Sequence, residues 1–325
     1  MIIKIQLWEP IISTIPDDTM LFAILDPSRA LSSKIIAENY INFYALRHPY
    51  VGDVIFRFEN LIDYESIHGL TRLFIPKEYM LPFVENMGFF ADLLKKGYAI
   101  NMPVSKQAID FYSTNCNVHH HMLIYGVDLH NQEFLCKDYY NHKFVEFKTP
   151  YFSLVSSTQR YNNPSSTESD GILAYKLDNE IDSKINYSKV HLELTKLYSS
   201  LQIGDIDAYG LSAILYFLKD MENQPLNTRF GVRWYETANY LRESAKLMKK
   251  RFYIIADDLA LEPNIEQKEK ISNLLSTASS LFFCVYKAVL ADKFDGHHKV
   301  IFSDLCLKCY DAWKEFTYAF LKIIE

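Results

Sequence analysis

Apolar positions recur every three or four residues through most of the second half of the chain. This spacing places the apolar side chains on one face of an α-helix, so it predicts helices. The expected helices cover residues 187–201, 207–218, 231–259, 265–290 and 302–324. Short polar or glycine-containing segments separate these helices, which predicts an all-helical domain over residues 181–325.

The first half of the chain mixes helical spacing with strand-like runs. The expected helices cover residues 16–25, 32–44 and 82–96, the last ended by Gly97. The expected strands cover residues 98–104, 120–128, 133–138 and 144–147. A polar turn at 129–132 joins the second and third strands into an antiparallel hairpin, so residues 1–160 are expected to form an α+β domain.

The segment 161–180 is polar and rich in small residues, and we expect a linker or exposed loop there. The composition supports an ordinary folded protein, with 49% hydrophobic and 23% charged residues. Glycine and proline together make up 21 of 325 residues. The average composition of proteins has roughly 12% of these two residues, so the chain contains fewer of them than usual. A chain so poor in turn-forming residues is not a barrel or propeller of many short strands.

Charge and cysteine usage narrow the functional classes. The net charge of -6 argues against a nucleic-acid partner, which needs clustered Lys and Arg. The sequence contains no run of the ~18 apolar residues that a membrane span requires, and residues 1–10 lack the features of a signal peptide. Five cysteines at no framework spacing favour a reduced, cytoplasmic location.

Three consecutive histidines, 119–121, precede the first strand of the hairpin, and Asp138 lies at the end of the second. The hairpin folds Asp138 back beside His120, and a carboxylate next to an imidazole orients it as a general base. Because side chains alternate along a strand, His119 and His121 share one face and His120 takes the other. Which of the three faces a cleft stays open, and a packing role for all of them is the alternative.

The string His-Met-Leu-Ile-Tyr-Gly-Val-Asp over residues 121–128, preceded by His120 and followed by Phe-Leu-Cys-Lys-Asp over 134–138, resembles a known hairpin. It is similar to the His-x5-Gly…Asp hairpin of papain-like cysteine peptidases that process bacteriocin leaders. It more closely resembles the family related to butirosin biosynthesis protein H. The strand after Lys96 and the string Arg-Phe-Gly-Val-Arg-Trp-Tyr at 229–235 extend the resemblance over most of the chain.

The resemblance implies a papain-like N-terminal domain, with His120 as general base and Asp138 as its orienting carboxylate. It implies an acyl- or peptidyl-handling protein of bacterial nonribosomal peptide or polyketide biosynthesis, with a small acyl or peptide ligand and an acyl or peptidyl carrier protein as partner. Active relatives carry a cysteine at the start of the N-terminal helix, where this chain has Asp17, Asp18 and Thr19. The alternative is therefore a catalytically silent binding or scaffold protein, and whether the chain is an enzyme stays open.

The remaining candidates are weaker. Cys116, in the loop before the histidines, is the alternative thiol, although a loop cysteine without a role is favoured. Cys136 is expected to be a packing residue, and Cys306 and Cys309 are expected to be buried helix cysteines rather than zinc ligands. The sequence carries no recognised cofactor motif, and we expect neither a cofactor nor a metal.

A basic run at 246–251 lies on an expected helix. It is interpreted as a solvated face, with docking of an acidic carrier protein as the alternative. A third functional interpretation, a helical interaction module beside an unrelated α+β domain, applies if the resemblance is accidental.

Overall fold

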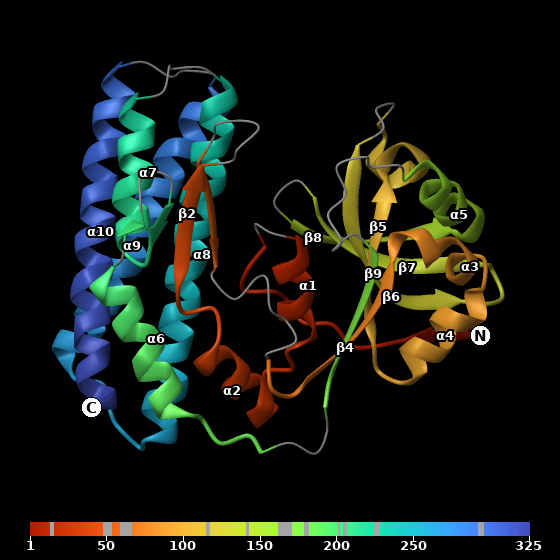
Figure 1. Cartoon of the computed structure of the whole chain (residues 1–325), viewed down its shortest axis with the longest axis horizontal. Helices are drawn as coiled ribbons and strands as arrows, with labels where there is room; N and C mark the ends of the chain where they lie inside the picture. Colours follow the sequence, from red (N-terminus) through yellow and green to blue (C-terminus); the bar gives the residue numbers. More distant parts are fainter. Residues whose placement is uncertain are drawn as a thin grey trace. The chain divides into compact units, whose positions relative to one another are not determined.

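The structure is a computed structural model, which describes residues 1–13, 16–47, 54–58, 67–114, 118–140, 143–161, 171–178, 182–200, 202–203, 207–223, 228–291 and 296–325. The chain forms two compact units, each built from two segments of sequence. The first unit contains residues 1–32 and 64–182, and the second contains 33–63 and 183–325. The expected α+β class is confirmed, with an antiparallel sheet in the N-terminal half and long packed helices in the C-terminal half (Figure 1).

An antiparallel sheet forms the centre of the first unit. Its strands among the described residues are β1 (Ile2–Lys4), β4 (Leu70–Pro76), β5 (Ala99–Ser105), β6 (His119–Asp128), β7 (Glu133–Tyr140), β8 (Lys143–Pro150) and β9 (Gly171–Leu177). They are ordered β4-β9-β5-β6-β7-β8, and β1 pairs with the end of β6 that β5 does not reach. The hairpin of β6 and β7 and the further strand β8 confirm the elements expected from the sequence.

The sheet differs from expectation at β9, which lies within the segment expected to be a linker or exposed loop. β9 is buried between β4 and β5, and it returns the chain to the sheet after α5 (Tyr151–Arg160). A Cβ at Gly171 would lie 2.2 Å from the carbonyl oxygen of Ile75. Glycine is therefore required at this position, where the backbones of β9 and β4 approach each other. Gly171 allows close packing within the sheet and does not mark a turn.

The helices of the first unit are short. They are α1 (Pro16–Ile24), α3 (Met80–Val84), α4 (Met87–Lys95) and α5, with 3-10 turns η3 (Lys77–Tyr79), η4 (Lys106–Ala108) and η5 (Asp110–Tyr112). The single helix expected over 82–96 is divided, because Asn86 caps α4 by accepting a hydrogen bond from the Phe89 amide at 3.3 Å. Gly97, with a φ of 86°, ends α4 as expected.

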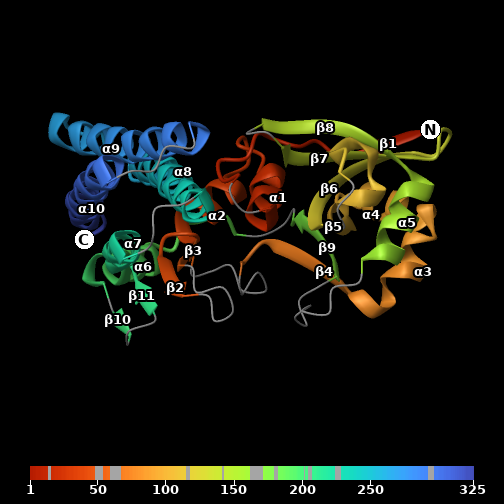
Figure 2. The same cartoon turned by 90° about the horizontal axis from the view of Figure 1, so that it is seen from above.

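Both faces of this sheet are covered. Ile100, Met102 and Met122 lie on the face that shares one hydrophobic core with α3, α4 and α5, which we call the core face. Leu123 and Leu173 alternate with these residues and are also buried, on the face that we call the α1 face. α1 contacts β5, β6, β7 and β9, and none of its residues belongs to the core on the other face. In Figures 1 and 2, β6 accordingly lies between α1 and α4.

The second unit combines long helices with a small antiparallel sheet. Its helices are most of α2 (Ala30–Glu38), then α6 (Tyr187–Ser199), α7 (Ser212–Asn223), α8 (Thr228–Asp258), α9 (Ile265–Leu290) and α10 (Gly296–Ile324). Its strands are β2 (Phe43–Arg47), β3 (Val54–Phe58), β10 (Gln202–Ile203) and β11 (Asp207–Tyr209), ordered β10-β11-β2-β3. The long helices match their expected ranges, whereas the helix expected over 32–44 ends at Glu38 and the one expected at 207 begins at Ser212.

β2 begins within the segment expected to be helical, whereas β3 lies where no element was expected. Alternate side chains of both strands are buried. Phe43 and Phe56 pack with ring centroids 4.9 Å apart, and Phe43 also meets Trp313 of α10. Tyr40, with a φ of 59°, lies in the left-handed region between α2 and β2 and prevents the helix from continuing.

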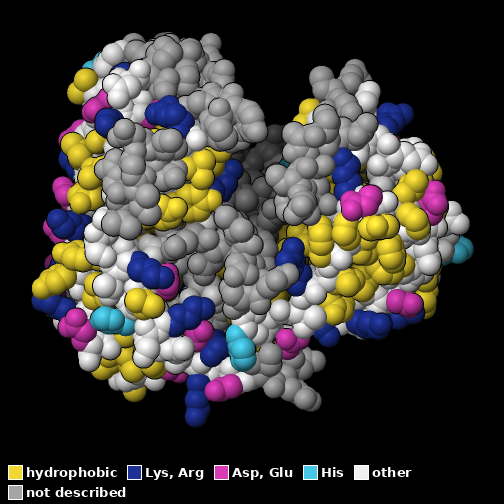
Figure 3. Space-filling view, in the orientation of Figure 1, with side chains coloured by type: hydrophobic (Ala, Val, Ile, Leu, Met, Phe, Trp, Pro, Cys, Tyr) yellow, Lys and Arg dark blue, Asp and Glu magenta, His cyan; other side chains and the backbone are white. Residues whose placement is uncertain are grey.

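Among the described residues, α9 is long and apolar enough to cross a membrane by length and composition alone. A helix in the core of a helical bundle satisfies the same criteria, and α9 packs against α8 and α10. Figure 3 shows Lys and Arg side chains interspersed with Asp and Glu side chains over the coloured residues of one face.

The basic run on α8 includes a cation that is not at the surface. Arg251 is 1% exposed, whereas Lys246 and Lys249 are exposed. The Nε of Arg251 donates to the carbonyl oxygens of Ile36 and Ala37 at 3.0 and 3.2 Å. A terminal nitrogen donates to those of Asn39 and Tyr40 at 2.6 and 3.1 Å. The solvated-face interpretation of 246–251 is therefore wrong at Arg251, which satisfies the carbonyl end of α2.

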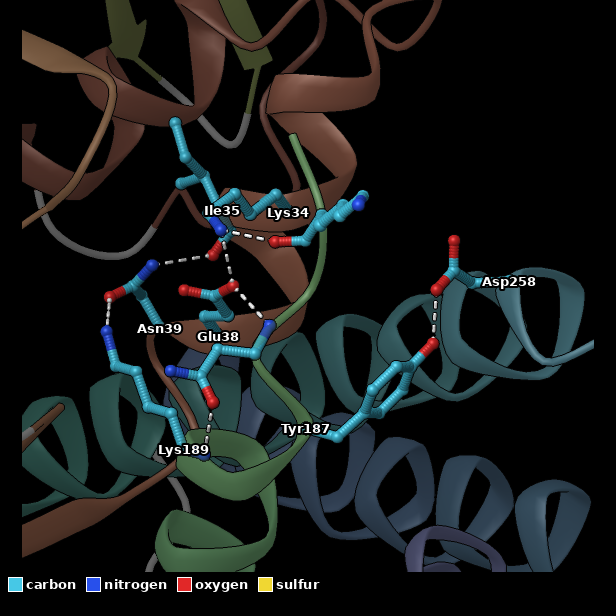
Figure 4. Close-up of polar contacts among 9 residues, drawn as sticks. Lys34, Ile35, Glu38, Asn39, Tyr187, Lys189 and Asp258 are labelled. Carbon is cyan, nitrogen blue, oxygen red and sulfur yellow. Dashed lines mark hydrogen bonds and ion pairs between the residues drawn. The ribbon is translucent and has the colours of Figure 1, made fainter. Parts of the chain in front are cut away.

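A second set of polar contacts holds α2 to the segment before α6 (Figure 4). Lys34 and Glu38 form a buried ion pair at 3.1 Å, and Glu38 accepts a hydrogen bond from the Asn186 amide at 2.7 Å. Lys189 donates to the side chain of Asn39 at 3.0 Å. Asn186 also caps α6, so the start of one helix and the end of another share one hydrogen-bond network.

We predict that Arg251→Leu lowers the free energy of unfolding by about 3 kcal/mol, since it leaves buried carbonyl oxygens without a donor. Burial lowers the pKa of Arg251 to about 9, so the guanidinium is charged at neutral pH and donates through all its nitrogens. Denaturant unfolding followed by circular dichroism measures the effect, and Lys249→Leu on the exposed side of α8 is the control. Equal losses in the two variants would contradict the capping role.

Candidate functional site

His120 and Asp138 meet where β6 begins and β7 ends. β6 and β7 pair Leu123 with Lys137 and Ile124 with Cys136, which places Asp138 diagonally across from His120 on one face. His120 Nε2 lies 2.7 Å from Asp138 Oδ2, so the two side chains are hydrogen bonded. The hairpin geometry expected from the sequence is confirmed for this pair.

Asp138 is held from a second direction by Tyr112, the last residue of η5. The Tyr112 hydroxyl donates to Asp138 Oδ2 at 2.8 Å, and both side chains are buried. Burial raises the pKa of Tyr112 far above its usual range, and the negative charge of Asp138 adds to the rise. The phenol therefore stays protonated and acts as a hydrogen-bond donor at every pH at which the protein is folded.

Lys106 adds a positive charge to this cluster. Its Nζ lies 4.8 Å from the ring centroid of Tyr112, a cation–π contact. Partial burial lowers the pKa of Lys106, while the nearby Asp138 carboxylate opposes that shift. No sequence pattern distinguishes Tyr112 or Lys106 from other residues, because both lie in 3-10 turns whose contacts with the hairpin depend on the tertiary fold.

Aromatic rings pack around the pair. The rings of Phe111 and Phe147 stack with centroids 3.9 Å apart, and Tyr140 lies 5.2 Å from Phe111. The Tyr112 ring meets the His120 imidazole edge-on at 5.6 Å. The imidazole thus contacts the Tyr112 ring, and Tyr112 in turn packs against Phe111, Tyr140 and Phe147.

The orientation of His120 determines which ring nitrogen can exchange a proton. Because Nε2 faces the carboxylate, it carries the proton of the neutral ring, and Nδ1 is the basic atom. The His120 side chain is 19% exposed, against 4% for Asp138. The arrangement is therefore an orienting acid shielded from water behind an imidazole that a solute can reach.

The other two histidines have different surroundings. His121 lies on the α1 face, where its Nδ1 is 3.0 Å from the amide oxygen of the buried Asn101. His119 packs its ring edge-on against Tyr161 at 4.8 Å. His120 takes the core face, and the histidine that shares a face with α1 is His121. The His120–Asp138 pair therefore lies on the opposite face of the sheet from α1, the helix that carries Asp17, Asp18 and Thr19.

The candidate nucleophile positions lie on α1. Thr19 is described and is 2% exposed, so its hydroxyl is shielded from solvent. The side chains of Asp17 and Asp18 and all of Cys116 lie outside the described residues.

The described cysteines do not replace the missing thiol. Cys136, Cys306 and Cys309 are buried, as expected, and burial raises the pKa of each. Cys284 is partly exposed, and its pKa is also raised by burial. Among the described residues, no group of three or more His, Cys, Asp or Glu side chains is arranged to hold a metal ion.

The chain was compared with protein families and with curated proteins. No protein-family model matches the chain, and no curated protein matches it either.

We predict that iodoacetamide at pH 8 modifies Cys284 slowly and leaves Cys136, Cys306 and Cys309 unmodified in the folded protein. A raised pKa lowers the thiolate fraction at a given pH, and burial blocks access of the reagent. Peptide mass mapping measures the modification, and the same reaction in denaturant should modify all four. Rapid modification of Cys136 in the folded protein would contradict its burial beside Asp138.

Proposed function

We propose that this protein handles acyl or peptidyl groups and that His120 serves as its general base. The observation that carries the proposal is the 2.7 Å contact of His120 Nε2 with the buried Asp138. A buried carboxylate fixes the tautomer of the imidazole and stabilises the imidazolium formed when the base takes up a proton. Asp138 is shielded from solvent, so the contact is not an ordinary ion pair on the protein surface.

The reaction that fits a base without a cysteine is direct attack by an amine on a thioester. The amine nitrogen forms a bond to the thioester carbonyl carbon, and His120 Nδ1 takes a proton from that nitrogen. The carbon–sulfur bond then breaks, and the proton passes from the imidazolium to the leaving thiolate. A thioester is already activated, so the step needs no covalent intermediate with the protein.

The resemblance to the family related to butirosin biosynthesis protein H supports the biological setting. It favours a papain-like fold for the first unit and a place in bacterial nonribosomal peptide or polyketide biosynthesis with a carrier protein as donor. The cysteine usage favours a cytoplasmic location. An acidic carrier would meet Lys246 and Lys249 on α8, because these are the exposed cations of the basic run and Arg251 is buried.

A binding or scaffold role is the second candidate, and two observations favour it. The sequence has no cysteine before Cys116, and Thr19 is buried. In this case the pair of His120 and Asp138 would serve binding and packing alone. Such a protein would retain affinity for an acyl-pantetheine thioester without converting it to an amide.

We predict that the protein forms an amide from an acyl-pantetheine thioester and a primary amine, and that His120→Ala reduces the rate roughly a hundredfold. Asp138→Asn should also reduce it, because an amide can present its NH₂ group to Nε2 and reverse the tautomer. The control is His130→Ala, which removes an exposed imidazole from the turn after β6. Amide release is followed by mass spectrometry and thiol release by absorbance.

The outcomes separate the candidates. Turnover that is equal in wild type and His120→Ala would overturn the proposed base. Thioester binding without turnover in the wild type would favour the scaffold role. Binding is measured by isothermal titration with a non-hydrolysable amide analogue of the thioester.

A further inference from the structure

Asp138 Oδ2 receives two hydrogen bonds, one from His120 Nε2 at 2.7 Å and one from the Tyr112 hydroxyl at 2.8 Å. When two donors bind one carboxylate oxygen, each of the two hydrogen bonds is weaker than it would be alone. The general base of the proposed function needs only the first of these bonds. The second comes from a different element, η5, and it makes a buried phenol part of the same cluster.

We infer that Tyr112 is a positioning residue that keeps His120 in its neutral, basic form by sharing the Asp138 carboxylate. A donor to the carboxylate stabilises the anion and so weakens its pull on the second imidazole proton. Without the hydroxyl of Tyr112, the buried carboxylate would interact more strongly with His120, although Lys106 would still contribute a nearby positive charge. More of the imidazole would then carry both ring protons, and an imidazolium is not a base.

The surroundings of His120 support this role for Tyr112. Among the described residues, the titratable side chains around the cluster of His120, Tyr112 and Asp138 include Lys106, Cys136 and Tyr140. The strands on either side contribute the apolar residues Val104, Val145 and Phe147. Lys106 acts in the same direction as Tyr112, since its positive charge also faces Asp138.

Tyr112 itself cannot easily change its protonation state. It is 4% exposed, and burial next to a carboxylate strongly disfavours the phenolate. Its ring also packs edge-on against His120 and within 6.2 Å of Tyr140, so the hydroxyl is held in place. A fixed donor of constant charge is suited to setting the protonation of a neighbour rather than to transferring protons.

The test uses the full chain with ¹⁵N-labelled histidine and needs no substrate. The ring nitrogen shifts of His120, assigned by comparison with His120→Gln, report the ratio of doubly to singly protonated imidazole at pH 7. We expect Tyr112→Phe, which keeps the ring and removes the hydroxyl, to raise this ratio about tenfold. The matched control is Tyr140→Phe, the same chemical change on a neighbouring ring, which should leave the ratio unchanged.

The ring signals of His121, whose partner Asn101 lies on the α1 face, show in the same spectrum that the fold is retained. If Tyr112→Phe does not fold, replacement of Tyr112 by 3-fluorotyrosine provides the opposite test. The fluorinated phenol is a stronger donor, so the ratio should fall. An unchanged ratio in the folded variant, or a ratio that moves in the opposite direction, would overturn the inference.

The inference rests on the proposed function only for its catalytic consequence, and the two can fail separately. If the base is real, the acidic limb of the pH–rate profile should move to higher pH in Tyr112→Phe while the alkaline plateau changes little. A shifted protonation ratio in a protein without turnover would support Tyr112 as a positioning residue and reject the base. If His120→Ala abolishes turnover but Tyr112→Phe leaves the protonation ratio unchanged, the base is supported and the positioning role of Tyr112 is rejected.

Discussion

The pairing of β6 with β7 is the constraint on which the first unit depends. The register that pairs Leu123 with Lys137 and Ile124 with Cys136, ahead of an irregularity between Ile124 and Gly126, brings Asp138 to His120. A slip of either strand by one residue would turn its core-facing residue, Met122 or Cys136, to the other face and separate the acid from the imidazole. The stability of the sheet and the candidate chemistry are therefore specified by the same hydrogen bonds. Buried apolar residues of the two strands, such as Met122 and Ile124, keep that register fixed.

Local patterns predicted the elements whose stability is largely local. The hairpin and the long helices α8 to α10 follow directly from alternation and helical spacing. The polar pair could be predicted because a hairpin relates the two ends of one short segment. β2 and β3 are close in sequence and pair directly, and β2 was missed because the helical spacing of residues 32–44 extends into it. β9 was missed because its partners β4 and β5 lie far away in sequence. Tyr112 was missed for the same reason, since only the folded chain brings η5 to the hairpin.

Arg251 illustrates how charge patterns mislead when burial is not known. A run of four cations among six residues is typical of a solvated helix face, and its lysines do lie at or near the surface. The arginine differs because its planar group can serve several carbonyl oxygens at once, whereas an ammonium has a compact donor geometry. The end of α2 provides those oxygens in a position where water is excluded.

The dependence of α2 on Arg251 has a consequence for folding during synthesis. Residues 36–40 leave the ribosome more than 200 residues before the side chain that binds their carbonyl oxygens. Over roughly the 10–40 s that translation of this interval takes, α2 lacks its final partner. The second unit must therefore complete its fold late, and the early segment has to remain unaggregated until α8 has emerged.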